Sequence, residues 1–253
     1  MSWKIFVNQL PESVLQAVLR IHKGVEENGE WRLLRLGNNR RIYRYQPSGD
    51  QAAWIVKWEW SRRPAHYFKS LRGKISAVDE QVATQTAIDA GLPAAACRFA
   101  SATRFYRWPL HTLLVFECLE ARPLRDVLFE ARHDGAALRR LLQAVAQLSA
   151  QIHRTGLLHG DFSSTNILAE ARGRLHIIDW KGLRRIEHGT IRDFRKDPAC
   201  LLEDLMELGL ARDEQKIFLG EYVRWGATLL SYRYPAFDGC HDFCRAKIPP
   251  AWV

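Results

Sequence analysis

Apolar and polar residues alternate in three consecutive runs near the start of the chain: WRLLRL (31–36), RRIYRYQ (40–46) and AAWIVKWEW (52–60). A period of two is typical of a strand with one buried face. Turn-forming residues separate the runs at 37–39 and 47–50, so the pattern predicts an antiparallel meander. In the third run one face carries Trp54, Val56, Trp58 and Trp60. Lys57 therefore leaves the sheet on the opposite face.

The segments before and after these three strands have apolar residues at helical spacing. We expect one helix at 11–22, with Pro11 in its first turn, and a second at 76–90. The second helix is ended by the sequence Gly-Leu-Pro at 91–93, because glycine caps a helix and proline cannot continue it. Two more strands are expected at about 96–102 and 111–119.

From residue 124 onward the apolar positions recur with the period of a helix. We expect helices at 124–133, 136–155, 198–208 and 212–232, followed by about twenty irregular residues. The change of period at 120–123 marks a joint between two lobes. The chain is therefore predicted to be an α+β protein, with an antiparallel β-sheet N-lobe at 1–120 and a mainly helical C-lobe at 121–253.

Composition places the chain among soluble globular proteins, with 47% hydrophobic and 26% charged residues in 253. The net charge of +9 favours anionic partners. The five cysteines are odd in number and sparse, which fits free thiols in a reducing compartment. No signal peptide is evident, and no run reaches the roughly 18 uncharged residues of a spanning helix. We expect a cytoplasmic protein, with a peripheral membrane contact left open.

Candidate chemistry is concentrated in LHGDFSSTNILAEARGRLHIIDW (158–180). Asp161 and Asn166 stand five residues apart on an expected tight loop, and Asp179 follows at the end of a hairpin. Two carboxylates and an amide facing one cleft could hold metal ions and orient an attacking hydroxyl, which are the main requirements of phosphoryl transfer. Taken alone, Asp161 and Asn166 could equally cap turns.

These residues resemble the catalytic loop of the protein-kinase-like superfamily, H-x-D-x-x-x-x-N, which is followed one hairpin later by a metal-binding Asp. The resemblance implies a bilobal protein-kinase-like fold with ATP and Mg²⁺ bound between the lobes. It implies that Asp161 is the catalytic base or hydroxyl-orienting residue. It also implies that Asn166 and Asp179 are the Mg²⁺ ligands.

The upstream half supplies the superfamily's remaining parts in the same order. Gly37 lies in the turn that would cover the phosphates, and Lys57 would hold the α- and β-phosphates while paired with Glu80. Asp79 and Glu59 compete with Glu80 for that role. The strand that enters the joint would bind adenine through its backbone, at Glu117 and Leu119.

Sequence features around the loop narrow the resemblance to one branch of the superfamily. Glycine precedes Asp161 where many regulated protein kinases carry arginine, Trp180 follows the metal Asp, and no Ala-Pro-Glu segment comes after. IHRTGLLHGD and RKDPACLLEDL resemble the bacterial lipopolysaccharide core kinases, which phosphorylate heptose or Kdo, over roughly residues 30–225. In that branch Asp197 would support the loop from behind.

The resemblance implies an ATP-dependent kinase of a lipopolysaccharide inner-core sugar, with a peripheral contact at the inner face of the inner membrane left open. The basic segment 181–197 follows Asp179, where an acceptor would dock; its cations include Arg184, Arg185, Arg192, Arg195 and Lys196. A solvated charged face explains that segment equally well.

Two alternatives stay open. One is an aminoglycoside- or choline-type small-molecule phosphotransferase; the other is a catalytically silent basic binding module on a kinase scaffold. No nucleic-acid partner is expected. Cys240 and Cys244 flank His241 as half a metal site, but a structural Zn²⁺ needs four ligands and no second pair has suitable spacing.

Overall fold

The computed structural model describes residues 3–21, 29–49, 52–60, 76–105, 108–186 and 196–233. The chain divides into two compact units, one of Met1–Asp89 with Ala94–Leu119 and one of Ala90–Pro93 with Glu120–Val253. Arg192, Arg195 and the Cys240–Cys244 segment lie outside the described residues. In the part of the chain that is described, no helix is both long enough and apolar enough to span a membrane.

The first unit is built on one six-stranded antiparallel sheet with the order β1-β5-β6-β4-β3-β2. Its strands are β1 (Trp3–Asn8), β2 (Trp31–Leu36), β3 (Arg40–Tyr45), β4 (Trp54–Trp60), β5 (Cys97–Phe105) and β6 (Trp108–Glu117). The predicted meander is β2-β3-β4, in which Tyr43 pairs with both Leu33 and Val56. The edge strand β1 was not predicted, because its partner β5 lies about a hundred residues away in sequence, with Trp3 opposite Thr103.

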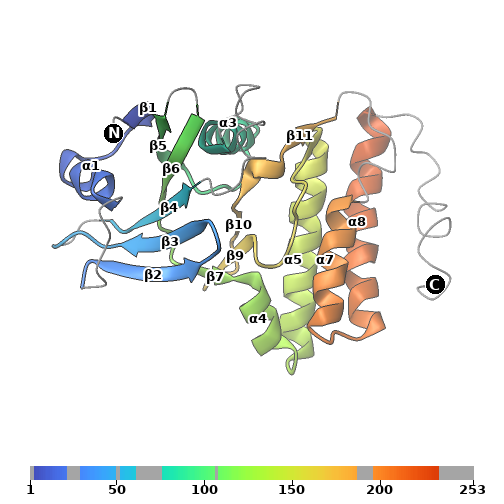
Figure 1. Cartoon of the computed structure of the whole chain (residues 1–253). Coiled ribbons are helices and arrows are strands. Elements are labelled where there is room, and N and C mark those ends of the chain that lie inside the picture. The colour runs from blue at the N-terminus through green and yellow to red at the C-terminus, as the bar shows by residue number, and fades with distance from the viewer. Residues whose placement is uncertain are drawn as a thin grey trace. The chain divides into compact units, whose positions relative to one another are not determined.

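Two helices cover opposite faces of this sheet (Figure 1). α1 (Glu12–Leu19) buries Val14 and Val18 against Val56. Pro11 is its N-cap, so the helix begins one residue later than predicted, and it ends three residues before the predicted end at 22. α3 (Ser76–Asp89) lies on the other face, where Ala77 packs with Leu114. Because Leu114 is the register partner of Lys57, that face is also the one Lys57 occupies. The predicted division of β4 into two faces is therefore confirmed.

The second unit is mainly helical. Its helices are α4 (Leu124–Ala131), α5 (Gly135–Arg154), α7 (Lys196–Glu207) and α8 (Arg212–Arg233). Asp134 is the N-cap of α5, and its carboxylate accepts hydrogen bonds from the N–H groups of Ala136 and Ala137, both at 3.0 Å. The apolar stripe of α5 is buried, and α8 packs along it (Figure 1).

Short strands carry the loops of the second unit. β10 (Leu175–Ile177), β9 (Ile167–Glu170) and β7 (Ala121–Pro123) form a three-stranded sheet, and β8 (Leu157–Leu158) pairs with β11 (Arg184–Arg185). The β9–β10 hairpin was predicted. β7, β8 and β11 were not, because each has only two or three residues and pairs with a strand that is distant in sequence, so no turn between neighbouring runs marks the pair.

Candidate active site

The predicted catalytic loop starts directly after β8, at His159-Gly160-Asp161. Gly160 has a φ of +83°, in the left-handed region. A Cβ at this position would lie 2.5 Å from the carbonyl oxygen of Gly182, and one at Gly182 would lie 2.8 Å from the carbonyl oxygen of His159. Two backbone segments thus touch here, so a side chain at position 160 would force them apart. This contact explains why glycine stands at position 160, where many regulated protein kinases carry arginine.

Asp197 holds the backbone of the catalytic loop through its carboxylate. Its Oδ2 accepts a hydrogen bond from the His159 N–H at 2.7 Å, and its Oδ1 accepts one from the Gly160 N–H at 2.9 Å. The side chain of His153 lies 3.4 Å from the same carboxylate. Burial would raise the pKa of Asp197, but the hydrogen bond and charge of His153 and the two N–H groups outweigh it and lower the pKa. The expectation that Asp197 supports the loop agrees with this geometry.

A second carboxylate of α7, Asp204, anchors the loop further along. Its Oδ2 accepts hydrogen bonds from the N–H of Ser164 at 2.5 Å and from the hydroxyl of Ser164 at 2.7 Å. Asp204 was not predicted from the sequence. The available signal was its seven-residue distance from Asp197, since two turns of helix bring both side chains to one face.

His159 joins the loop to the segment that carries Asp179. Its Nε2 lies 3.0 Å from the carbonyl oxygen of Ile178, and its Nδ1 accepts a hydrogen bond from the Asp161 N–H at 3.3 Å. The ring also meets the buried Trp180 edge-on, with 4.8 Å between centroids. Burial lowers the pKa of His159, although Asp197 opposes that shift. A neutral imidazole donating through Nε2 satisfies both contacts.

Asp161 and Asn166 are brought together as predicted. Asp161 is exposed, whereas Asn166 is buried and donates through Nδ2 to the backbone oxygen and to Oδ2 of Asp161, both at 2.9 Å. These two bonds fix the amide, so its oxygen is the atom that could bind a cation. The Ile178 N–H donates to the Asn166 carbonyl oxygen at 2.9 Å, which brings the residue before Asp179 against Asn166.

Asp179 has an unusual backbone conformation, with φ 60° and ψ 54°. It is the one non-glycine residue with positive φ among those described. Such a conformation costs about 1 to 2 kcal/mol for a residue with a Cβ. A retained cost of this kind is typical of functional sites, and it fits a carboxylate whose direction matters.

The donor set of Asn166 and Asp179 fits Mg²⁺. Within the described ranges, no group of three or more His, Cys, Asp or Glu side chains is placed to hold a metal ion. Mg²⁺ does not require such a group, because it binds through one or two protein oxygens together with substrate phosphates and waters. One amide oxygen and one carboxylate meet that requirement.

In the first unit, Lys57 and Glu80 form a buried ion pair. Lys57 Nζ lies 2.8 Å from Oε2 and 3.0 Å from Oε1 of Glu80, and the two residues are 5% and 1% exposed. Glu59 is the more distant neighbour, at 3.6 Å, while Asp79 is exposed. The structure thus joins the lysine and the glutamate that were predicted to pair.

The remaining predicted nucleotide-binding residues also belong to the first unit. The Gly37 N–H donates to the Arg40 carbonyl oxygen at 2.9 Å and closes the β2–β3 turn. The Glu117 N–H donates to the Ala96 carbonyl oxygen at 3.1 Å. Among the described residues, none accepts a hydrogen bond from the Leu119 N–H, so this group is the better candidate donor to a base.

Solved structures share this fold. WaaP in complex with acyl carrier protein is 19% identical, with 94% of this chain and 99% of that chain covered and a TM-score of 0.57. WbdD bound to a kinase inhibitor is 15% identical, with 88% and 50% covered and a TM-score of 0.51. A rhoptry antigen kinase domain from Toxoplasma gondii is 12% identical, with 94% and 92% covered and a TM-score of 0.51. The predicted α+β, protein-kinase-like fold is confirmed.

Sequence comparison gives the family. No curated protein sequence matches the chain. Residues 28–222 match the sequence pattern of the lipopolysaccharide kinase (Kdo/WaaP) family. Because this match spans most of the 253 residues, the chain belongs to the lipopolysaccharide kinase (Kdo/WaaP) family.

Proposed function

We propose that the protein transfers the γ-phosphoryl group of ATP to a hydroxyl of a heptose or Kdo in the lipopolysaccharide inner core. Family membership supports a lipopolysaccharide-related phosphotransferase. The observation that carries the proposed phosphoryl transfer is the pairing of an exposed Asp161 with a buried, orientationally fixed Asn166 on a loop held by two carboxylates.

Asp161 would act on the acceptor. Its backbone is fixed by the His159 ring and by the Asn166 amide, while its carboxylate stays exposed. A carboxylate held in this way can accept the proton of a sugar hydroxyl as the hydroxyl oxygen bonds to the γ-phosphorus and the bond to the leaving phosphate breaks. The rigid backbone supplies the positioning that such a transfer needs.

The phosphate charge would be neutralised by Mg²⁺ and by Lys57. Asn166 and Asp179 would hold the Mg²⁺, which neutralises phosphate oxygens when bound. Lys57 would bind the α- and β-phosphates, and Glu80 keeps its ammonium group in place. Gly37 would cover the phosphates, and backbone groups of Glu117 and Leu119 would bind adenine.

The acceptor is proposed to be an anionic glycan. Arg184 and Arg185 of β11 are exposed and follow Asp179 by five and six residues. These two positive charges would repel a cationic acceptor, so they argue against an aminoglycoside- or choline-type phosphotransferase. The same cations favour a peripheral contact with the anionic inner face of the inner membrane.

A protein partner is also proposed. The WaaP structure that resembles this chain was solved with acyl carrier protein, and the likeness covers nearly the whole of both chains. We extend that partner to this protein. Size-exclusion chromatography of the two purified proteins tests the proposal: co-elution supports it, and separate elution contradicts it.

Mass spectrometry of core oligosaccharide from cells with and without the gene tests the proposed function. We expect the deletion strain to lack one phosphate, and the wild-type gene to restore it. The Asp161→Ala gene should fail to restore it although the protein accumulates. Restoration by Asp161→Ala would instead support a catalytically silent binding module.

A further inference from the structure

We propose that a cavity lined by α4 and the end of α7 binds an uncharged sugar ring of the acceptor, next to the ring that is phosphorylated. The inference rests on the proposed function and deepens it, because it assigns the residues that select a glycan over a single sugar. No residue of the cavity belongs to the catalytic or metal-binding set.

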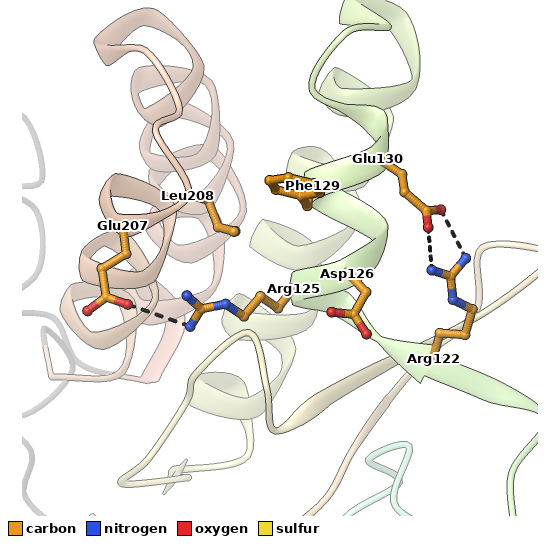
Figure 2. Close-up of a pocket in the computed structure, with 7 residues that line it drawn as sticks. All are labelled: Arg122, Arg125, Asp126, Phe129, Glu130, Glu207 and Leu208. Carbon is orange, nitrogen blue, oxygen red and sulfur yellow. Dashed lines mark hydrogen bonds and ion pairs between the residues drawn. The ribbon is translucent and has the colours of Figure 1, made fainter.

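The cavity lies entirely within the second unit and has a volume of about 460 Å³. Its lining consists of Arg122, Arg125, Asp126, Phe129, Glu130, Glu207 and Leu208. Figure 2 shows Phe129 and Leu208 approaching each other from the two sides, with Arg125 reaching across to Glu207. This volume is within the usual range of small-molecule sites.

Both walls of the cavity are tied to the catalytic loop. The Arg125 N–H donates to the Ser164 carbonyl oxygen at 3.2 Å, which anchors the start of α4. On the other side, Asp204 binds Ser164 and precedes Glu207 by one turn of α7. Ser164 is three residues from Asp161, so the Cα atoms of these two residues lie within about 11 Å of each other. A short oligosaccharide spans that distance.

The polar lining alternates donors and acceptors. Arg122 pairs with Glu130 at 2.9 and 2.5 Å, and Arg125 lies 3.5 Å from Glu207. The lining has two arginines and three carboxylates, counting Asp126, and the Arg132 guanidinium lies on the Phe129 ring, so positive and negative charges balance. A site without excess positive charge does not favour an anion. Sugar hydroxyls donate and accept, so a neutral ring can bond to both kinds of group, and exposed ion pairs cost little to rearrange.

The cavity also offers an apolar surface. Phe129 is 49% exposed, a large fraction for an aromatic side chain. The Arg132 guanidinium stacks on its ring, 3.7 Å from the centroid, and so limits the positions the ring can take. A sugar ring has one face rich in C–H groups, and such a face packs on an aromatic side chain while the hydroxyls at its edge reach the polar lining.

Steady-state kinetics on two acceptors test the assignment. The acceptors are de-acylated, dephosphorylated inner-core oligosaccharide and the free monosaccharide that product analysis shows to carry the phosphate. For Phe129→Ala we expect the KM for the oligosaccharide to rise about three- to tenfold, the loss expected of one aromatic contact. The KM values for the monosaccharide and for ATP should not change. Trp225→Ala is the matched control, since Trp225 is an exposed aromatic of the same unit outside the cavity.

The outcomes separate the two proposals. If Phe129→Ala leaves the KM for the oligosaccharide unchanged, or changes both acceptors equally, the sugar subsite is wrong. If the wild-type protein phosphorylates neither acceptor, the proposed function is wrong. The cavity is then tested alone by saturation-transfer NMR with the same oligosaccharide: a signal lost in Phe129→Ala and kept in Trp225→Ala supports the subsite, and equal signals contradict it.

Discussion

The ion pair of Lys57 and Glu80 allows stability and catalysis to be separated. Lys57→Ala would remove the ammonium group that lies 2.8 Å from the Glu80 carboxylate, on a residue that is 1% exposed. Removal of one member of a buried pair costs about 3 to 5 kcal/mol, because the remaining charge stays desolvated. This is a large part of the 5 to 15 kcal/mol that typically stabilises a folded protein. A loss of activity in this variant would therefore say little about phosphate binding.

The double variant Lys57→Met with Glu80→Leu removes both charges and keeps similar volumes. Apolar replacement of a buried ion pair is often neutral or stabilising, so we expect the free energy of unfolding to return to within about 1 kcal/mol of the wild type. Transfer of phosphate from ATP should stay at least about 100-fold below the wild type, since a cation directed at the developing charge is still missing.

Urea titration and steady-state kinetics on the same preparations measure the two effects. Asp79→Asn is the matched control, because Asp79 is the exposed neighbour of Glu80. We expect this control to keep both stability and activity. Recovery of wild-type transfer by the double variant would refute the reasoning, because it would show that Lys57 matters only as the partner of Glu80.

Three further predictions concern the second unit. Asp197→Asn should lower stability by about 1 to 3 kcal/mol in urea titration and lower kcat, because one buried N–H loses its acceptor; an effect no larger than that of the exposed Asp213→Asn would contradict this. Burial lowers the pKa of His159 in the folded protein below the ordinary value of 6.5, so below pH 6.5 the unfolded chain binds more protons than the folded one. Stability should therefore fall as the pH drops from 7 to 5.5. The melting temperature of His159→Gln should change less over this pH range than that of the wild type, and an equal change would contradict the assignment. Asp179→Gly relieves the left-handed backbone, so its melting temperature should stay near that of the wild type while Mg²⁺-dependent transfer is lost; retained transfer would exclude Asp179 as a ligand.

Much of the fold followed from local periodicity. The β2-β3-β4 meander alternates with a period of two, and α5 carries a clear apolar stripe with a period of 3.6 residues. α3 was bounded mainly by the Gly-Leu-Pro sequence that follows it, and the positions of α3, α5 and α8 were predicted closely. β1 and the pair of β8 and β11 were missed. A strand of two residues has no period, and a distant edge pairing depends on the completed sheet and not on the local sequence.

The residues of the candidate site likewise include some that were predicted from the sequence and some that were missed. Lys57 and Glu80 were found from their order relative to the catalytic loop, and the structure joins them. Asp204 was not found, because its role depends on how α7 packs behind the loop. Gly182 was missed for a related reason: its lack of a side chain matters only because the Gly160 backbone lies against it.

The most direct test of the account uses purified protein, ATP, Mg²⁺ and inner-core oligosaccharide, with the product phosphate detected by mass spectrometry. The wild-type protein should phosphorylate the oligosaccharide. Asp161→Asn should be folded, since its side-chain oxygen can still accept from Asn166, and should transfer phosphate at least about 100-fold more slowly, as expected for loss of a general base. Transfer by Asp161→Asn at the wild-type rate, or wild-type phosphorylation of cationic small molecules alone, would contradict the account.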